Sequence, residues 1–376
     1  MTHLPSRTSA ARNTGFSMVE LLVGVAIALI GMVIMFQVME NSENRKRTTA
    51  SGSDAQIAGS IAMHLLERDL RLAGNGFGSS AGLGCTVNAY DTVRGAAFTF
   101  PMTPIQIVDG GGGAPDQLIV LYGNSPVAGT GYTFNNSSAT TKKMDTTSSR
   151  AGLQRGDLLF VVGTSCGMIE VTDNTDADQL TINHVSGAYN DTQGVATTSR
   201  FNAPTGFTIP SGQLFSLGFR DVPRRNSWQI NNGRTLTVTD DLHFTDAFDQ
   251  TVTPAAAGAD GQNDFQEVGD GIIDLQAQYG LDTDGDFMAD TWQVAAPASW
   301  QEVIAVRIAL LARSQHFEKI AVTNAAPGWA AGNFVMTNLD GSPDSTPGDA
   351  NDWRHYRYRV YQTAIPLRNV IWGITP

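Results

Sequence analysis

Near its amino terminus the chain holds one long apolar run, FSMVELLVGVAIALIGMVIMF, which covers residues 16–36 and carries a single charge, Glu20. About 20 apolar residues are enough to cross a bilayer as a helix. The run is longer than the apolar part of a secretory signal peptide, and no A-x-A cleavage pattern follows it. Because basic residues precede the run and none follows it before Arg45, we expect the amino terminus in the cytoplasm.

The helix is predicted to continue beyond the apolar run. No proline lies between Pro5 and Pro101, and the segment 57–73 repeats apolar residues every three or four positions. The residues expected to form one apolar stripe are Ile57, Ile61, Leu65, Leu66, Leu70 and Ala73. Gly74-Asn75-Gly76 supplies a stop signal, so the pattern predicts a helix over 16–73.

After Gly76 the pattern changes to short strands between Gly, Asn, Asp and Thr turns. The predicted strands are Ile105–Val108, Gln117–Tyr122, Asp157–Val162, Met168–Thr172, Gln179–Asn183, Leu214–Phe219, Ser227–Ile230, Thr235–Thr239, Gly271–Leu281, Glu302–Arg313 and Arg354–Thr363. Residues 128–150 are expected to form a long polar loop. The predicted fold class is α+β: a long amino-terminal helix, transmembrane in its first half, packed on an antiparallel β-sheet with an inserted strand-rich lobe.

Composition narrows the function classes. The 376 residues carry 24 Lys and Arg against 36 Asp and Glu, which gives a formal net charge of −12. No basic stripe stands out, so we expect no nucleic-acid partner. Charged residues are only 16% of the chain, and Gly is abundant with 39 residues, which favours an exported, loop-rich β protein. No HExxH, GxSxG or P-loop motif is present, and we expect no enzymatic activity.

Glu20 needs an explanation, because a carboxylate inside a membrane span is costly and marks function. The residues around it, GFSMVELL over 15–22, resemble the class III signal of type IV pilins and type II secretion pseudopilins. The resemblance implies cleavage after Gly15 by a prepilin peptidase and N-methylation of Phe16. It also implies that Glu20 pairs with the Phe16 amino group of a neighbouring subunit. A signal anchor with an accidental Glu is the alternative.

The resemblance divides the chain into a leader (1–15), a pilin helix (16–73) with its transmembrane part at 16–36, and an exported β-rich domain (74–376). Such a subunit has a cytoplasmic amino terminus and a periplasmic domain while it is held in the inner membrane. It would later stand at the pilus tip on the cell surface.

Blocks near the carboxyl terminus narrow the resemblance further. The segments YGLDTDGD (279–286), VRIALLAR (306–313) and RYRVYQTAIPLRN (357–369) resemble the PilW group of minor pilins, which is similar in layout to the J-type minor pseudopilin of type II secretion. This implies a pilus-tip subunit that assembles with other minor pilins and the major pilin, helps to start polymerisation and presents a large tip adhesin. The alternatives are a type II secretion pseudopilin, or a surface-binding lobe delivered by a pilin helix.

One acidic loop is the candidate metal site. Asp282, Asp284, Asp286 and Asp290 alternate along a turn, where their carboxylates can converge on a hard cation such as Ca²⁺. The loop is not an EF-hand, because Phe287 stands where that motif needs Gly; it resembles the DxDGDxxxD loops of thrombospondin type 3 repeats. An acidic turn without a ligand is the alternative.

The chain has two cysteines, Cys85 and Cys166. Under the expected topology both lie in the exported part, where an oxidising compartment favours a disulfide. Two buried thiols are the alternative.

Overall fold

The computed structural model of the chain describes residues 17–125, 131–144, 152–173, 180–243, 265–342 and 351–372. The chain divides into two compact units, Met1–Ser51 and Gly52–Pro376. Gly15 and Phe16, where processing is expected, lie outside the described residues, and so does the rest of the expected leader.

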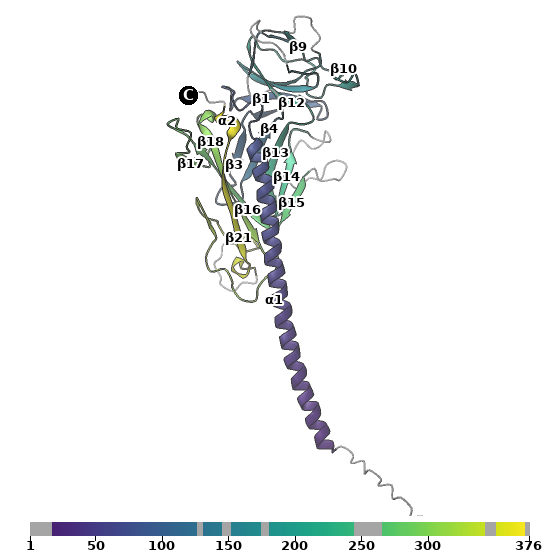
Figure 1. Ribbon diagram of the computed structural model, residues 1–376, viewed down its shortest axis with the longest axis vertical. Coiled ribbons are helices and arrows are strands. Elements are labelled where there is room, and N and C mark those ends of the chain that lie inside the picture. The colour runs from purple at the N-terminus through teal and green to yellow at the C-terminus, as the bar shows by residue number, and fades with distance from the viewer. Residues whose placement is uncertain are drawn as a thin grey trace, which may run out of the picture. The chain divides into compact units, whose positions relative to one another are not determined.

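A single long helix, α1, covers Met18–Leu72 (Figure 1). The predicted helix over 16–73 is confirmed within the described residues. The helix stops where Gly74 and Gly76 take φ angles of 77° and 93°, a left-handed conformation that glycine adopts without strain. The Gly74 N–H then donates a hydrogen bond to the Leu121 carbonyl at 2.9 Å, which joins the end of the helix to a strand.

A four-stranded antiparallel sheet packs one face on the second half of α1. Its strands, in spatial order, are β17 (Thr291–Gln293), β16 (Ile272–Leu281), β18 (Val303–Arg313) and β21 (Tyr358–Pro366). Alternate β18 residues such as Val306 and Ile308 join the main core, whereas Ala309 and Leu311 pack with Phe334 on the other face. That outer face is covered by the segment that holds the short pair β19 (Gly328–Trp329) and β20 (Gly332–Asn333). Three short helical turns complete this part: η1 (Trp300–Glu302), η2 (Trp353–His355) and α2 (Arg368–Ile371).

A five-stranded antiparallel sheet also packs on α1, and the two sheets and the helix share one core (Figure 1). Its order is β15 (Gln266–Asp270), β14 (Thr235–Asp240), β13 (Arg224–Asn231), β4 (Gln117–Tyr122) and β3 (Ile105–Val108). Strands β4 and β13 are neighbours, and Tyr122 pairs with Arg224. The lobe, residues 123–223, is therefore inserted between two strands that pair directly.

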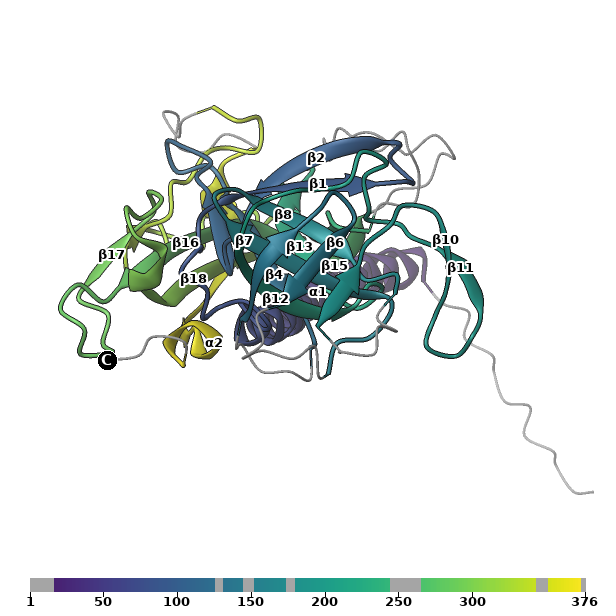
Figure 2. The same ribbon diagram turned by 90° about the horizontal axis from the view of Figure 1, so that it is seen from above.

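The third sheet forms that lobe and part of its junction with the main core. Its order is β2 (Ala96–Pro101), β1 (Thr86–Asp91), β8 (Cys166–Glu170), β7 (Asp157–Gly163), β12 (Gly212–Phe219), β5 (Tyr132–Ser137), β6 (Thr141–Met144) and β9 (Thr181–Asn183). A separate hairpin holds β10 (Ala188–Asn190) and β11 (Ala196–Thr198). Figure 2 shows this hairpin and β17 on opposite sides of the globular unit.

One sequence prediction about this sheet is wrong. The region 128–150 is not one polar loop, because β5 and β6 lie in it and pair with each other. The sheet is mixed, because β1 pairs with β8 in parallel. The other predicted strands are present with small shifts at their ends.

Strand β7 serves two cores, which explains its continuous apolar sequence. Leu158 and Phe160 belong to the main core, whereas Leu159 and Val161 belong to a separate core within the lobe. The predicted strand-rich lobe thus has its own apolar interior.

Candidate functional site

The first turn of α1 presents Glu20. The Ser17 N–H donates to Glu20 Oε2 at 3.0 Å, and the Val19 N–H donates to Ser17 Oγ at 3.3 Å. This reciprocal arrangement is a capping box, which provides acceptors for amide groups at the start of a helix. The Ser-x-x-Glu pattern could have revealed it in the sequence. Glu20 is exposed and forms no ion pair with any described residue, so the chain leaves its charge without a counter-ion there.

The helix beyond Glu20 presents apolar side chains to its surroundings. Residues Met18–Glu43 have a mean hydropathy of 2.6, and none of their 18 most apolar consecutive residues is buried. This is the one helix among the described residues that is long and apolar enough to cross a membrane. Val19, Leu22 and Phe36 are each more than half exposed, so this surface requires a non-aqueous partner.

The second half of α1 packs on the sheets through only part of the stripe expected from the sequence, because Leu66, Leu70 and Ala73 are buried whereas the two isoleucines are not. Ile57 is 56% exposed and Ile61 is 49% exposed, so the prediction that they lie on the buried stripe is wrong. The buried face instead holds small residues at Ala55, Gly59 and Ala62 before it reaches Leu66 and Leu70. These small residues let the sheet approach closely: a Cβ on Gly59 would lie 2.2 Å from the Tyr361 ring.

Near its end, α1 buries a carboxylate that sequence reasoning missed. Asp69 is fully buried and accepts hydrogen bonds from Asn226 Nδ2 at 2.7 Å, Trp228 Nε1 at 3.2 Å and the Tyr122 hydroxyl at 3.3 Å. Burial beside this carboxylate raises the pKa of Tyr122. Asp69 therefore ties the helix to β4 and β13.

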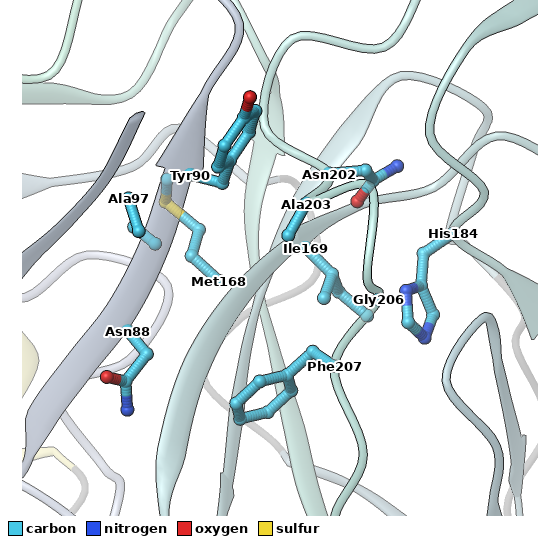
Figure 3. A pocket seen from close by; sticks show the side chains of 11 residues that line it. Asn88, Tyr90, Ala97, Met168, Ile169, His184, Asn202, Ala203, Gly206 and Phe207 are labelled. Carbon is cyan, nitrogen blue, oxygen red and sulfur yellow. The ribbon is translucent and has the colours of Figure 1, made fainter. Parts of the chain in front are cut away.

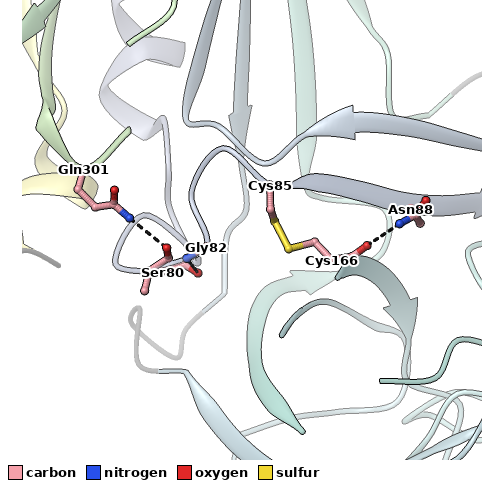
Figure 4. Close-up of a disulfide and its surroundings, with 7 residues drawn as sticks. Ser80, Gly82, Cys85, Asn88, Cys166 and Gln301 are labelled. Carbon is pink, nitrogen blue, oxygen red and sulfur yellow. Dashed lines mark hydrogen bonds between the residues drawn. A yellow bond between two sulfur atoms is a disulfide. The ribbon is translucent and has the colours of Figure 1, made fainter. Parts of the chain in front are cut away.

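The two cysteines form the predicted disulfide, Cys85–Cys166, with a Cα–Cα distance of 6.2 Å (Figure 4). It joins the residue before β1 to the first residue of β8. Asn88 Nδ2 donates to the Cys166 carbonyl at 3.0 Å beside it. The bridge thus fastens the lobe sheet at the point where its parallel pair begins.

The acidic loop brings together three of its four predicted ligands. Carboxylate oxygens of Asp282, Asp284 and Asp290 lie within 4.8 Å of one another, and Asp286 is not part of this group. Asp282 accepts from the Gly285 and Phe287 N–H groups at 2.7 and 2.9 Å. The carboxylates therefore hold the turn themselves, and the calcium assignment stays a prediction.

The lobe contains a small cavity of about 120 Å³, shown in Figure 3. His184 and Phe207 line it together with Met168 and Asn202. The buried ammonium of Lys142, which does not line the cavity, lies 2.8 Å from His184 Nε2 and donates to the Phe207 carbonyl at 2.7 Å.

Burial lowers the pKa of Lys142 to about 8 and, with the nearby Lys142 charge, lowers the pKa of His184 to about 3. The imidazole is therefore neutral, and its Nε2 accepts a hydrogen bond from the Lys142 ammonium. Because Lys142 and His184 are both closed from solvent, the pair stabilises the lobe interior rather than meeting a substrate.

Comparison with known proteins identifies the carboxyl-terminal region. Residues 240–369 match the family model PilW, described as Type IV Pilus-assembly protein W. No curated protein and no solved structure matches the chain. The match includes all of the four-stranded sheet β17-β16-β18-β21, whereas the lobe lies outside the match. The region 240–369 is therefore a domain of the type IV pilus-assembly protein W family.

Proposed function

We propose that this chain is a minor pilin that takes part in the assembly and the tip complex of a type IV pilus. The observation that carries the proposal is the PilW match over 240–369, in a chain whose described part begins with an exposed apolar helix. Its role is to help start polymerisation and to present a tip adhesin, together with other minor pilins and the major pilin. The type IV description of the family favours a pilus over a type II secretion pseudopilus. The proposal includes no catalytic activity.

Processing follows from the same proposal. A prepilin peptidase removes the leader 1–15 after Gly15, and the mature chain begins at N-methylated Phe16. The apolar helix is retained and holds the subunit in the inner membrane, with the amino terminus in the cytoplasm and the domain 74–376 in the periplasm, until the subunit moves to the pilus tip. Amino-terminal mass analysis tests this: an intact Met1, or a cut beyond Phe36, contradicts it.

Glu20 is the residue proposed to drive assembly. Its carboxylate is exposed at the start of an apolar helix and has no cation among the described residues. In a filament, the Phe16 amine of the adjoining subunit can supply that cation in a low-dielectric environment, where an ion pair is much stronger than in water. Removal of one partner leaves the other charge buried, which costs roughly 3–5 kcal/mol.

The test is co-purification with the other minor pilins from detergent. Glu20→Ala is expected to insert and to be cleaved normally, but its recovery in the complex is expected to fall at least tenfold, and pilus number with it. Glu67→Ala is the matched control, because Glu67 is a carboxylate on the same helix that pairs with Arg71 at 3.5 Å within the chain. Normal recovery of the complex and a normal number of pili with Glu20→Ala would show that assembly does not need Glu20.

A second candidate function, recognition of a surface by the lobe, is favoured by the separate lobe core and by the insertion between β4 and β13. Deletion of the whole lobe is a poor test, because Leu158 and Phe160 also belong to the main core. Replacement of the exposed β10–β11 turn at 192–194 leaves both cores intact. Lost attachment with a normal number of pili would favour a binding lobe, whereas unchanged attachment would count against this turn as a contact.

A further inference from the structure

A cleft of about 280 Å³ lies at the start of the globular unit, where its first residue, Gly52, is part of the wall. Its other walls come from Gln56 on α1, Thr323, and the residues around the start of β21, Arg357 to Arg359. Hydrogen bonds join these walls: the Tyr361 hydroxyl donates to the Gln56 carbonyl at 2.9 Å, and Thr323 Oγ1 donates to the Tyr356 carbonyl at 2.6 Å. The cleft is therefore formed by segments that are fixed to one another.

Two arginines give the cleft its charge. Arg357 is 53% exposed and donates through Nε to Glu318 Oε1 at 2.9 Å. Arg359 is exposed, and its guanidinium has no hydrogen bond or ion pair with any residue in the described ranges. Asp54, an exposed acid on the adjacent turn of α1, is not among the lining residues. The cleft is thus open to an anion, in a chain that is strongly acidic as a whole.

The length of the covalent chain limits how far this cleft can lie from the end of the candidate span. The candidate span ends at Glu43, nine residues before Gly52. Nine residues extend at most about 30 Å in any conformation, and about 13 Å as a helix. The intervening sequence includes Arg45-Lys46-Arg47. Basic residues therefore follow the end of the span closely, in addition to the two arginines of the cleft. Each Lys or Arg close to an anionic membrane surface contributes about 1 kcal/mol of attraction, which is a factor of about five in binding affinity.

We propose that Arg357 and Arg359 bind the phosphate of an anionic lipid headgroup in the leaflet from which the span emerges. The guanidinium of Arg359 provides the open donors, and Arg357, two residues earlier, adds a second guanidinium whose Nε is held by Glu318 and whose other N–H groups can donate. This contact holds the globular unit against the membrane until the subunit is withdrawn into a filament. It rests on the membrane-held state of the proposed function, and not on any step of pilus assembly.

The test is native mass spectrometry of the full chain, released from detergent that contains equal amounts of phosphatidylglycerol and phosphatidylcholine. Wild type is expected to retain phosphatidylglycerol in preference to phosphatidylcholine, and Arg357→Gln with Arg359→Gln is expected to weaken that retention by about 10- to 30-fold. Arg368→Gln is the matched control, because Arg368 is an exposed arginine beside the other end of α1, where Asn369 bonds the Leu72 carbonyl. It is expected to leave retention unchanged.

Further measurements distinguish a lipid headgroup from free inorganic phosphate as the ligand, and a conservative variant controls for misfolding. Arg359→Lys keeps the charge and is expected to retain most of the binding, and 0.5 M salt is expected to weaken wild-type binding. Equal retention by wild type and the double variant overturns the proposal. Equal retention of both lipids by wild type overturns it too, and so does displacement of phosphatidylglycerol by millimolar inorganic phosphate. Because the assay contains no other pilus component, its failure leaves the proposed pilus function standing.

Discussion

Each half of α1 carries a notable carboxylate, but among the described residues only the one in the second half has partners from other elements of the fold. Asp69 is buried and receives hydrogen bonds from Asn226, Trp228 and Tyr122. Among the described residues Glu20 accepts a hydrogen bond from the Ser17 amide alone, and the side chains around it are exposed and apolar. A carboxylate whose hydrogen bonds come from the folded unit acts in folding, whereas the proposed function assigns Glu20, which has no cation among the described residues, to assembly. Under that proposal the same helix has a folding half and an assembly half.

The largest effect on stability is expected for Asp69→Ala. The change leaves the Asn226, Trp228 and Tyr122 donors buried without their acceptor, at a cost of about 3 kcal/mol or more. The melting temperature of the globular unit is expected to fall by roughly 5–10 °C. Calorimetry of Glu20→Ala is expected to give the wild-type melt, and Asp54→Ala is the control because Asp54 is exposed on the same helix. Equal melting temperatures for Asp69→Ala and Glu20→Ala would contradict the distinction drawn between the two carboxylates.

The sequence pattern predicted the long helix well and its buried face less well. Periodicity favoured Ile57 and Ile61, because isoleucine is the stronger apolar signal. The structure buries Ala55, Gly59 and Ala62 instead, since only small residues let the sheet approach the helix. Asp69 could not be recognised from the sequence, because its three partners come from strands 53 to 159 residues away.

Within the folded unit, another buried carboxylate, Asp274, gives stability a pH dependence. Burial raises the pKa of Asp274 to about 7, with a smaller contribution from the nearby Asp116 charge. Because the folded pKa lies above the unfolded one, this contribution to stability is fully present below about pH 4 and is lost as the pH rises through 7. The loss is on the order of 2–4 kcal/mol.

Asp274→Asn removes this titration and keeps an acceptor for Gln276 Nε2, which lies 2.9 Å from Asp274 Oδ1. The variant is expected to melt higher than wild type at pH 8 and no higher at pH 4. Asp157 and Asp241, whose pKa values burial raises to about 6, add to the loss of stability with rising pH, whereas His184, whose pKa is lowered to about 3, opposes it between pH 5 and 6.5 and leaves the net sign unchanged. A wild-type melting temperature that rises from pH 5 to pH 8 would contradict this prediction.

A smaller effect is expected from matched glycine substitutions in the two halves. Gly59→Ala drives a Cβ into the Tyr361 ring and is expected to cost about 1–3 kcal/mol. Gly31→Ala meets open space, so it is expected to leave the melt unchanged or to stabilise the helix by up to about 1 kcal/mol. If Gly31 contacts a neighbouring subunit, Gly31→Leu is expected to reduce recovery of the complex without changing the melt. A lower melt for Gly31→Ala would show that the first half also contributes to the fold.

The lobe was the hardest region to predict. Strands β5 and β6 have polar sequences, YTFNNS and TKKM, that resemble a loop by local pattern. Their strand conformation comes from pairing with each other and, for β5, with β12 about 80 residues later. The disulfide was predictable because only two cysteines exist and both were expected in an oxidising compartment, whereas the Lys142–His184 pair depends on contacts that no spacing indicates.

The smallest effect is expected at the acidic loop, where the carboxylates differ from both Asp69 and Glu20. Asp284 and Asp290 are exposed, so water already satisfies much of their need, and Asp282 accepts amide hydrogen bonds within the turn. A bound Ca²⁺ ion therefore adds only its mass-action contribution, about 1.4 kcal/mol at ten times its dissociation constant, or a rise of a few degrees in the melting temperature. Asp284→Asn is expected to abolish the rise in protein first treated with a chelator. Asp286→Asn is the matched control, because Asp286 lies in the same loop but outside the group of three, and it is expected to retain the rise. An unchanged melting temperature in 10 mM calcium would show that the loop is an acidic turn held by its own hydrogen bonds. The loop would then belong with Asp69 among the carboxylates that the chain satisfies, and both would differ from Glu20.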